Sequence, residues 1–176
     1  MESKKHEIDV IEKSVPTQKT LSRKASILVN CDKQTAFDYI SSSGELSQWL
    51  KKSGPVPGVV NVKILKGPYN FIGAQREIYF DGNAKATEQL MTHNPPGNYL
   101  YNIQHFNNFL EKLSGEAYGQ LWFDNEGDKT RITWEYSFNY HNIFSRMILS
   151  LFLTFAYKKF MKAGLVNAKA NLELKK

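Results

Sequence analysis

The stretch NIFSRMILSLFLTFAYKKFMKAGLVNAKANLEL, residues 142–174, decides the fold, because it contains no proline and a single glycine, Gly164. It predicts one long C-terminal helix, interrupted near Gly164. At ~1.5 Å per residue, about 30 helical residues would extend roughly 45 Å. The segment MILSLFLTFA in its first half is apolar all round, so we expect other parts of the chain to cover it on more than one side.

The residues before this helix form short strand patterns separated by turns. Residues 26–30 predict a first strand, and two short helices follow at 33–40, with Asp32 as N-cap, and at 45–51. Further strands are predicted wherever alternating or β-branched segments are bounded by turn residues, at 59–66, 74–80, 85–92, 99–105, 116–123 and 129–138.

This element order predicts the α+β class, with a curved antiparallel sheet of about seven strands wrapped around the long C-terminal helix. That helix is the one element long enough to cover the apolar concave face of the sheet. A sheet wrapped around a helix leaves a gap near its open end, and this gap is the candidate site. Residues 1–20 are polar and weakly periodic, so we expect an N-terminal extension before a single domain at 21–176.

Composition and charge exclude several classes of function. The chain has 176 residues, and its single cysteine, Cys31, excludes an internal disulfide and a cysteine-based metal site. Zinc-finger spacing, an RNP-like strand and an arginine-rich run are all missing, so we expect no nucleic-acid partner. The longest uncharged apolar run, residues 147–157, is shorter than the ~20 residues of a membrane span. With no secretory signal at the start, the sequence predicts a cytoplasmic protein.

The net charge of +6 is concentrated near the C-terminus, where residues 157–176 contain six lysines and a single acidic residue, Glu173. One interpretation is a solvated helix face with favourable cations near a helix end. The alternative is contact with an anionic membrane surface or a partner, because apolar residues 147–155 precede the lysines. A homodimer contact through this segment also stays open.

Several short motifs occur in the order that is typical of one superfamily. They are TAFDYI at 35–40 in the first helix, Trp49 before the second strand, GAQR at 73–76, Glu88 in the next strand, TRITW at 130–134 and GLVNAK at 164–169. On these residues the chain resembles the START-like or Bet v 1-like helix-grip superfamily, in particular the polyketide cyclase/dehydrase and lipid-transport group (SRPBCC), over roughly residues 22–174. The resemblance implies a deep, mostly apolar cavity between sheet and helix. Members bind lipids, sterols, polyketides or other hydrophobic molecules, and some catalyse cyclisation or dehydration, so the scaffold does not by itself fix the function.

Strand alternation selects the candidate ligand-binding residues. If Arg76 faces the cavity, neighbouring positions of the same parity on each strand face it too. Glu135 is added because related hormone-binding members place a glutamate there. The candidates are Arg76, Ile78, Phe80, Glu88, Leu90, Tyr101, Ile103, Tyr118, Trp122 and Glu135. The aromatic members are equally consistent with cavity wall and with ordinary core, since the two are one surface in this fold.

Arg76 and Glu88 flank the turn at residues 81–83 and could meet across it. In a functional interpretation, the arginine holds a ligand carboxylate or enolate and Glu88 acts as a general base. In a structural interpretation, the two form an ion pair that satisfies both charges inside the sheet. His105 is either an acid or base with them or a hydrogen-bonded residue at the rim. The four histidines lack metal-ligand spacing and no glycine-rich nucleotide loop occurs, so we expect neither a metal nor another cofactor.

Three functions follow from these observations. The first is binding of one hydrophobic or amphipathic small molecule, lipid-like or polyketide-like, in the cavity. The second is a cyclase or dehydratase acting on an aromatic or polyketide precursor, with Glu88, His105 and Arg76 as catalytic residues. The third is a membrane- or partner-associated protein that uses the apolar and basic C-terminal helix.

Overall fold

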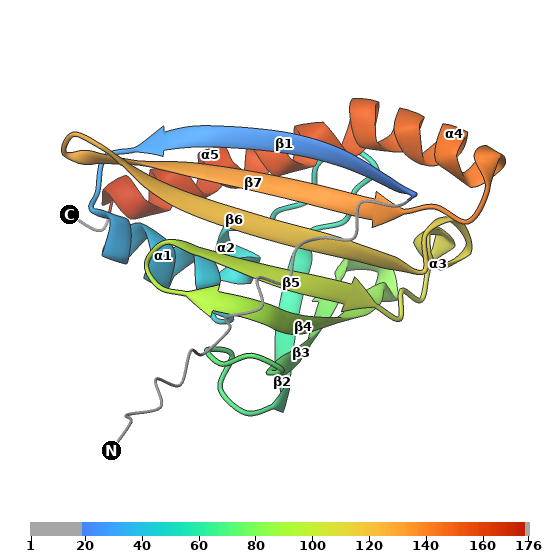
Figure 1. Ribbon diagram of the computed structural model, residues 1–176, viewed down its shortest axis with the longest axis horizontal. Helices are drawn as coiled ribbons and strands as arrows, with labels where there is room; N and C mark the ends of the chain where they lie inside the picture. The colour runs from blue at the N-terminus through green and yellow to red at the C-terminus, as the bar shows by residue number, and fades with distance from the viewer. Residues whose placement is uncertain (1–18, 175–176) are drawn as a thin grey trace, which may run out of the picture.

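The computed structural model describes residues 19–174, so most of the predicted N-terminal extension at residues 1–20 lies outside the described residues. Strands and helices follow one another in nearly the predicted order (Figure 1). The strands are β1 (Thr20–Val29), β2 (Val59–Lys66), β3 (Gln75–Phe80), β4 (Lys85–Asn94), β5 (Asn98–Gln104), β6 (Glu116–Glu126) and β7 (Lys129–Asn139). The helices are α1 (Lys33–Ser41), α2 (Leu46–Trp49), the 3₁₀ turn η1 (Asp81–Asn83), α3 (Phe109–Leu113), α4 (Ile143–Phe152), the π-helical turn η2 (Leu153–Tyr157) and α5 (Lys158–Leu174).

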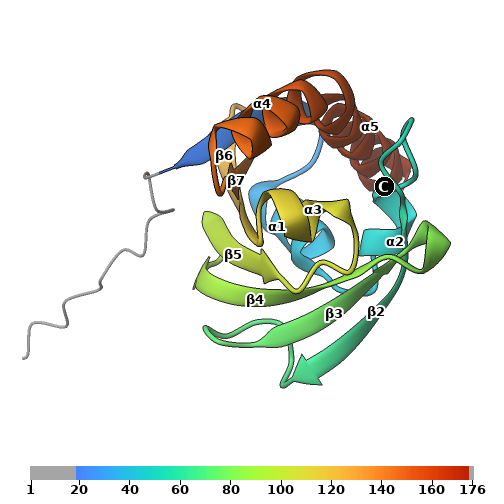
Figure 2. The same cartoon turned by 90° about the vertical axis from the view of Figure 1, so that its right-hand side faces the viewer.

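All seven strands belong to one antiparallel sheet in the order β1-β7-β6-β5-β4-β3-β2, which leaves β1 and β2 at its edges. The sheet curls, and α4 and α5 lie across its open side (Figure 2). α3 occupies the near end of the enclosed space in that view, close to α4. This is the predicted helix-grip arrangement, and its apolar core lies between the concave face and the helices.

Local sequence signals explain where the main helices begin. The Asp32 carboxylate accepts a hydrogen bond from the backbone N–H of Thr35 at 2.9 Å, which confirms the predicted N-cap of α1. Asn142 caps α4 in the same way, and Ser145 completes a reciprocal capping box. β1 is longer than the predicted residues 26–30, because Arg23 and Lys24 hide the apolar alternation of its first half.

The interruption of the C-terminal helix lies at η2 and not near Gly164, so that expectation is wrong. The π-helical turn accommodates one extra residue, and this keeps Leu149, Leu153 and Tyr157 all facing the core. Arg23 on β1 fixes this turn, since its guanidinium donates to the Thr154 hydroxyl at 2.7 Å.

Gly164 has a packing role within an unbroken α5. A side chain there would place its Cβ 3.2 Å from Leu50 Cδ2 and 3.4 Å from the Trp49 ring. The glycine therefore allows α5 to approach the segment at the end of α2 closely, which seats Trp49 against the core.

The expectation that the apolar first half of the helix is covered on several sides is also wrong. Within MILSLFLTFA, Leu149 and Leu153 are buried, but Met147 is 58 % exposed, Leu151 57 % and Phe155 65 %. Within residues 19–174, no helix combines the length and the apolarity needed to cross a membrane.

Gly119 on β6 controls the position of Tyr101 on the paired strand β5. A Cβ at Gly119 would overlap the phenol ring of Tyr101, which covers the glycine on the concave face. The absence of a side chain at residue 119 therefore creates the space that Tyr101 fills.

We expect Gly119→Ala to lower the free energy of unfolding by about 1–3 kcal/mol, because the added methyl group displaces a buried ring. Gly44→Ala is the matched control, since the nearest atom to its new Cβ, Ser42 Oγ, is 3.8 Å away. That control should change stability by less than about 0.5 kcal/mol. Urea denaturation measures both variants, and equal stabilities would contradict the assigned packing.

Candidate functional site

Two adjoining chambers lie between the concave face of the sheet and the C-terminal helix. The inner chamber has a volume of about 50 Å³, and buried polar side chains form part of its wall. The outer chamber has a volume of about 70 Å³ and an almost wholly apolar wall. Five residues line both chambers and form the junction between them: Phe80, Ile103, Tyr136, Tyr157 and Phe160.

The outer chamber reaches the surface between two loops and two helices. Pro55 and Pro57, which follow α2, lie on one side, and Phe109 of α3 lies on the other. Phe152 of α4 contacts Phe109, with their ring centroids 5.3 Å apart. Pro55 and Phe109 are exposed, so this rim forms the mouth of the cavity.

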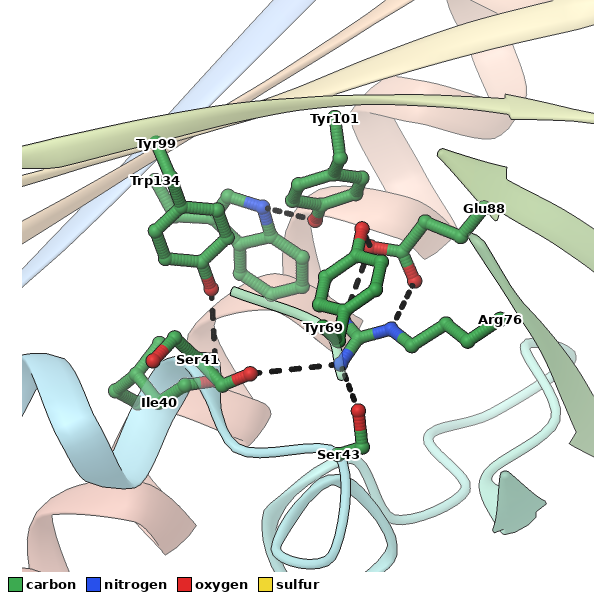
Figure 3. Close-up of polar contacts among 9 residues, drawn as sticks. All are labelled: Ile40, Ser41, Ser43, Tyr69, Arg76, Glu88, Tyr99, Tyr101 and Trp134. Carbon is green, nitrogen blue, oxygen red and sulfur yellow. Dashed lines mark hydrogen bonds and ion pairs between the residues drawn. The ribbon is translucent and has the colours of Figure 1, made fainter. Parts of the chain in front are cut away.

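Arg76 and Glu88 form a bidentate ion pair in the wall of the inner chamber (Figure 3). They are direct cross-strand neighbours on β3 and β4, which places both side chains on the concave face. Arg76 Nε donates to Glu88 Oε2 and Nη2 to Oε1, each at 3.0 Å. The side chains are only 2 % and 5 % exposed, so each charge depends on the other for solvation.

Further groups complete the environment of this pair (Figure 3). Arg76 Nη1 donates to Ser43 Oγ at 2.9 Å, in the segment after α1. The ring of Tyr69 lies over the guanidinium at 3.8 Å, and its hydroxyl donates to Glu88 Oε1 at 3.2 Å. Burial is the largest single influence and acts to lower the pKa of Arg76, but the Glu88 carboxylate together with Tyr69 and Tyr99 outweighs it and the pKa is raised, so the arginine stays charged.

Two tyrosines line the inner chamber beside the pair (Figure 3). The Tyr99 hydroxyl donates to the carbonyl of Ile40 at 3.4 Å, whereas the Tyr101 hydroxyl accepts a hydrogen bond from Trp134 Nε1 at 3.1 Å. Burial raises the pKa of both phenols, so both keep their protons at neutral pH. Among the hydrogen bonds of residues 19–174, the Tyr101 hydroxyl hydrogen has no acceptor, which leaves it available to a ligand.

The wall therefore combines a neutralised ion pair with an available neutral donor. Trp49 Nε1 is a second buried donor without a partner in the described part of the chain, on a side chain that also lines the inner chamber. Such donors interact with a carbonyl, ether or hydroxyl oxygen. A ligand carboxylate would instead compete with Glu88 for Arg76, so the geometry favours the structural interpretation of the ion pair.

The structure brings six of the predicted site residues to the inner chamber: Arg76, Ile78, Phe80, Glu88, Tyr101 and Ile103. Leu90 shares their parity but packs in the core, outside the lining of both chambers. The alternation predicted for β3 and β4, and for β5 as far as Ile103, is thus the observed one.

The expected placement of Tyr118, Trp122 and Glu135 is wrong, because these residues lie on the convex face. Ala117, Gly119, Leu121 and Phe123 occupy the concave face of β6 instead. Glu135 pairs there with Lys24 at 3.1 Å, and the same lysine lies over the Trp122 ring at 5.2 Å. The Tyr118 hydroxyl donates to Glu116, and burial followed by this carboxylate raises the pKa of Tyr118 to about 12.

His105 also lies outside both chambers, so the predicted catalytic set does not assemble. It follows the end of β5 with a φ of 57°, and this left-handed conformation ends the strand alternation that would have turned it inward. It is exposed in a shallow surface depression with His141 and Glu111. The cyclase or dehydratase activity stays a prediction, and no histidine, lysine, cysteine or second carboxylate joins Glu88 among the residues that line the inner chamber.

Sequence reasoning missed Tyr69, Tyr99, Tyr157 and the residues of α3. Tyr69 lies in the loop between β2 and β3, where no periodicity indicates a direction. Tyr99 shares the parity of Tyr101 and could have been found by extending that row.

In residues 19–174, no three His, Cys, Asp or Glu side chains are grouped so that they could hold a metal ion.

A curved antiparallel sheet that grips a C-terminal helix over internal chambers defines the Bet v 1-like helix-grip class of domains. Residues 20–173 match the sequence model of the family described as polyketide cyclase / dehydrase and lipid transport, and the chain belongs to this family. Comparison with curated protein sequences finds no match.

Solved structures with the same fold share little sequence with this chain. Ara h 8.0201 is 12 % identical with a TM-score of 0.64, over 88 % of this chain and 99 % of that one. A protein from Arthrobacter aurescens is 14 % identical with a TM-score of 0.67, over 88 % and 87 %. A point mutant of Thalictrum flavum norcoclaurine synthase, in complex with a transition-state analogue, is 13 % identical with a TM-score of 0.65, over 89 % and 97 %. At these identities the likeness shows the fold alone.

We expect loss of one member of the ion pair to be more damaging than loss of both. Arg76→Met or Glu88→Leu should each lower the free energy of unfolding by about 3–5 kcal/mol, because each leaves a buried charge without its partner. The double variant should be more stable than either single variant. A double-mutant cycle by chemical denaturation measures this, and additive losses would show that the two charges do not depend on each other.

Proposed function

We propose that this chain binds one amphipathic small molecule, lipid-like or polyketide-like, between the sheet and the C-terminal helix. The observation that carries the proposal is the pairing of an apolar outer chamber with an inner chamber whose wall includes available neutral donors. The apolar body of the ligand occupies the outer chamber and the junction. Its polar end, a carbonyl or hydroxyl oxygen, accepts a hydrogen bond from Tyr101.

Apolar walls supply affinity, and the polar end supplies orientation. Burial of apolar ligand surface contributes about 25 cal/mol per Å² before the costs of association. The hydrogen bond to Tyr101 adds about 0.5–1.5 kcal/mol. Family membership supports a ligand-binding domain in general, and the neutral chamber wall supports an uncharged polar end.

The size of the chambers indicates that the mouth must open. Volumes of about 50 and 70 Å³ exceed what one water needs, roughly 10–15 Å³, but are smaller than an engineered cavity of roughly 150 Å³ that holds benzene. Entry of a larger ligand therefore requires rotation of aromatic side chains. Phe109, which is 51 % exposed at the rim, has room to rotate toward solvent.

Within a cell, we propose a cytoplasmic location for this binding activity.

We expect octanol to displace the apolar fluorescent probe N-phenyl-1-naphthylamine more effectively than octanoate at pH 8, since the carboxylate would be desolvated beside Glu88. Tyr101→Phe should weaken octanol binding about three- to ten-fold through loss of one hydrogen bond. Tyr118→Phe, on the convex face, is the matched control and should have no effect. Tighter binding of octanoate, or equal effects of the two variants, would contradict the proposal.

Access through the junction gives a second test. Ile103→Trp should fill the passage between the chambers and abolish displaceable probe binding. Gln104→Trp changes the next residue, whose side chain is exposed, and should leave binding intact. Undiminished probe binding by Ile103→Trp would show that the probe binds elsewhere.

A further inference from the structure

The exposed side of α4 and η2 is a continuous apolar surface, here called the α4 face. Its members recur at helical spacing along one side of the helix and are 46–71 % exposed. They are Ile143, Phe144, Met147, Ile148, Leu151 and Phe155. Isolated exposed apolar residues are ordinary, but a contiguous stripe of this kind marks an interaction surface.

The charges on the helical segment that carries the α4 face all have one sign. From Asn142 to Leu172 the sequence contains no aspartate or glutamate. Lys159 and Lys162 follow Phe155 along the same side of the helix, about one and two turns further toward the C-terminus. Both side chains are exposed. In the described part of the chain, Arg146, Lys158, Lys159 and Lys162 take part in no salt bridge.

This charge distribution distinguishes between two occupants of the face. A second copy of the chain, related by two-fold symmetry, would place the basic stretch of residues 142–172 opposite itself, with no acidic residue in that stretch to compensate. An anionic lipid surface provides what the face lacks, with acyl chains for the apolar stripe and negative headgroups for the lysines.

The α4 face is also continuous with the mouth of the cavity. Phe152 belongs to α4, lines the outer chamber and contacts exposed Phe109 across the rim. α3 and α4 lie next to each other at the same end of the molecule (Figure 2). A surface that covers the α4 face therefore lies beside the opening of the outer chamber.

We propose that the α4 face docks on an anionic lipid bilayer, with the helix in the plane of the interface and the lysines of early α5 at the headgroups. Docking itself is independent of what the cavity binds. The consequence that the ligand passes between bilayer and cavity at this mouth rests on the proposed function.

Vesicle flotation tests the docking. The full chain should float with vesicles of phosphatidylcholine and phosphatidylglycerol, weakly with phosphatidylcholine alone, and less at high salt. The double variant Leu151→Glu, Phe155→Glu should lose flotation. Lys159→Gln with Lys162→Gln should weaken binding about thirty-fold, because each lysine near an anionic surface contributes about a factor of five. Val60→Glu with Ile72→Glu introduces the same charges at exposed apolar residues far from α4 and should float normally.

Two results would overturn the docking proposal. One is absence of flotation with anionic vesicles. The other is a dimer in sedimentation equilibrium that Leu151→Glu with Phe155→Glu dissociates, because the occupant would then be a second copy. Octanol binding without vesicles, measured on the same glutamate variants, separates the two proposals. It should remain normal if only docking is lost, whereas its absence in the unmodified chain would contradict the cavity function alone.

Discussion

The buried ion pair between Arg76 and Glu88 is the constraint around which the chamber is arranged. Two charges removed from water are tolerated only when each is paired and hydrogen-bonded. The sheet register supplies the pair, and two loops complete it, since Ser43 hydrogen-bonds Arg76 and Tyr69 covers both partners. The pair therefore connects β3, β4 and the segments after α1 and β2 at one point. Because the charges cancel, the chamber beside them offers a ligand neutral donors rather than a free cation.

The rest of the site follows from packing against this point. Gly119 leaves space for Tyr101. The Tyr101 hydroxyl oxygen accepts a hydrogen bond from Trp134, while the hydrogen of the same hydroxyl stays available. The π-helical turn keeps Tyr157 facing the junction, and the exposed apolar residues of α4 and of this turn form the α4 face. The inner side of this one helix thus forms part of the cavity wall, and its outer side forms a surface beside the mouth of the cavity. Ligand binding and docking on a lipid surface are compatible uses of this arrangement.

The sequence predicted the architecture because its signals were local: turn residues between strands, a capping aspartate and an uninterrupted helical stretch. It predicted the concave residues of β3 to β5 because Arg76 and Glu88 fixed the parity there. On β6 the same reasoning failed, since the larger residues Tyr118 and Trp122 lie outside while Gly119 faces inward to make room for Tyr101. This orientation of β6 depends on Tyr101 of the neighbouring strand, so the sequence of β6 alone does not indicate it. His105 was misplaced because its own left-handed backbone ends the alternation of β5, and Tyr69 was missed because it lies in an irregular loop.

The central claim is that the paired chambers hold a neutral amphipathic molecule. Native mass spectrometry of the freshly purified chain, followed by solvent extraction and identification of whatever it carries, tests this claim most directly. We predict a second species heavier by one uncharged molecule that has an apolar body and a carbonyl or hydroxyl group, and loss of this species in Ile103→Trp. Bare polypeptide alone, or a bound molecule that persists in Ile103→Trp, would contradict the account.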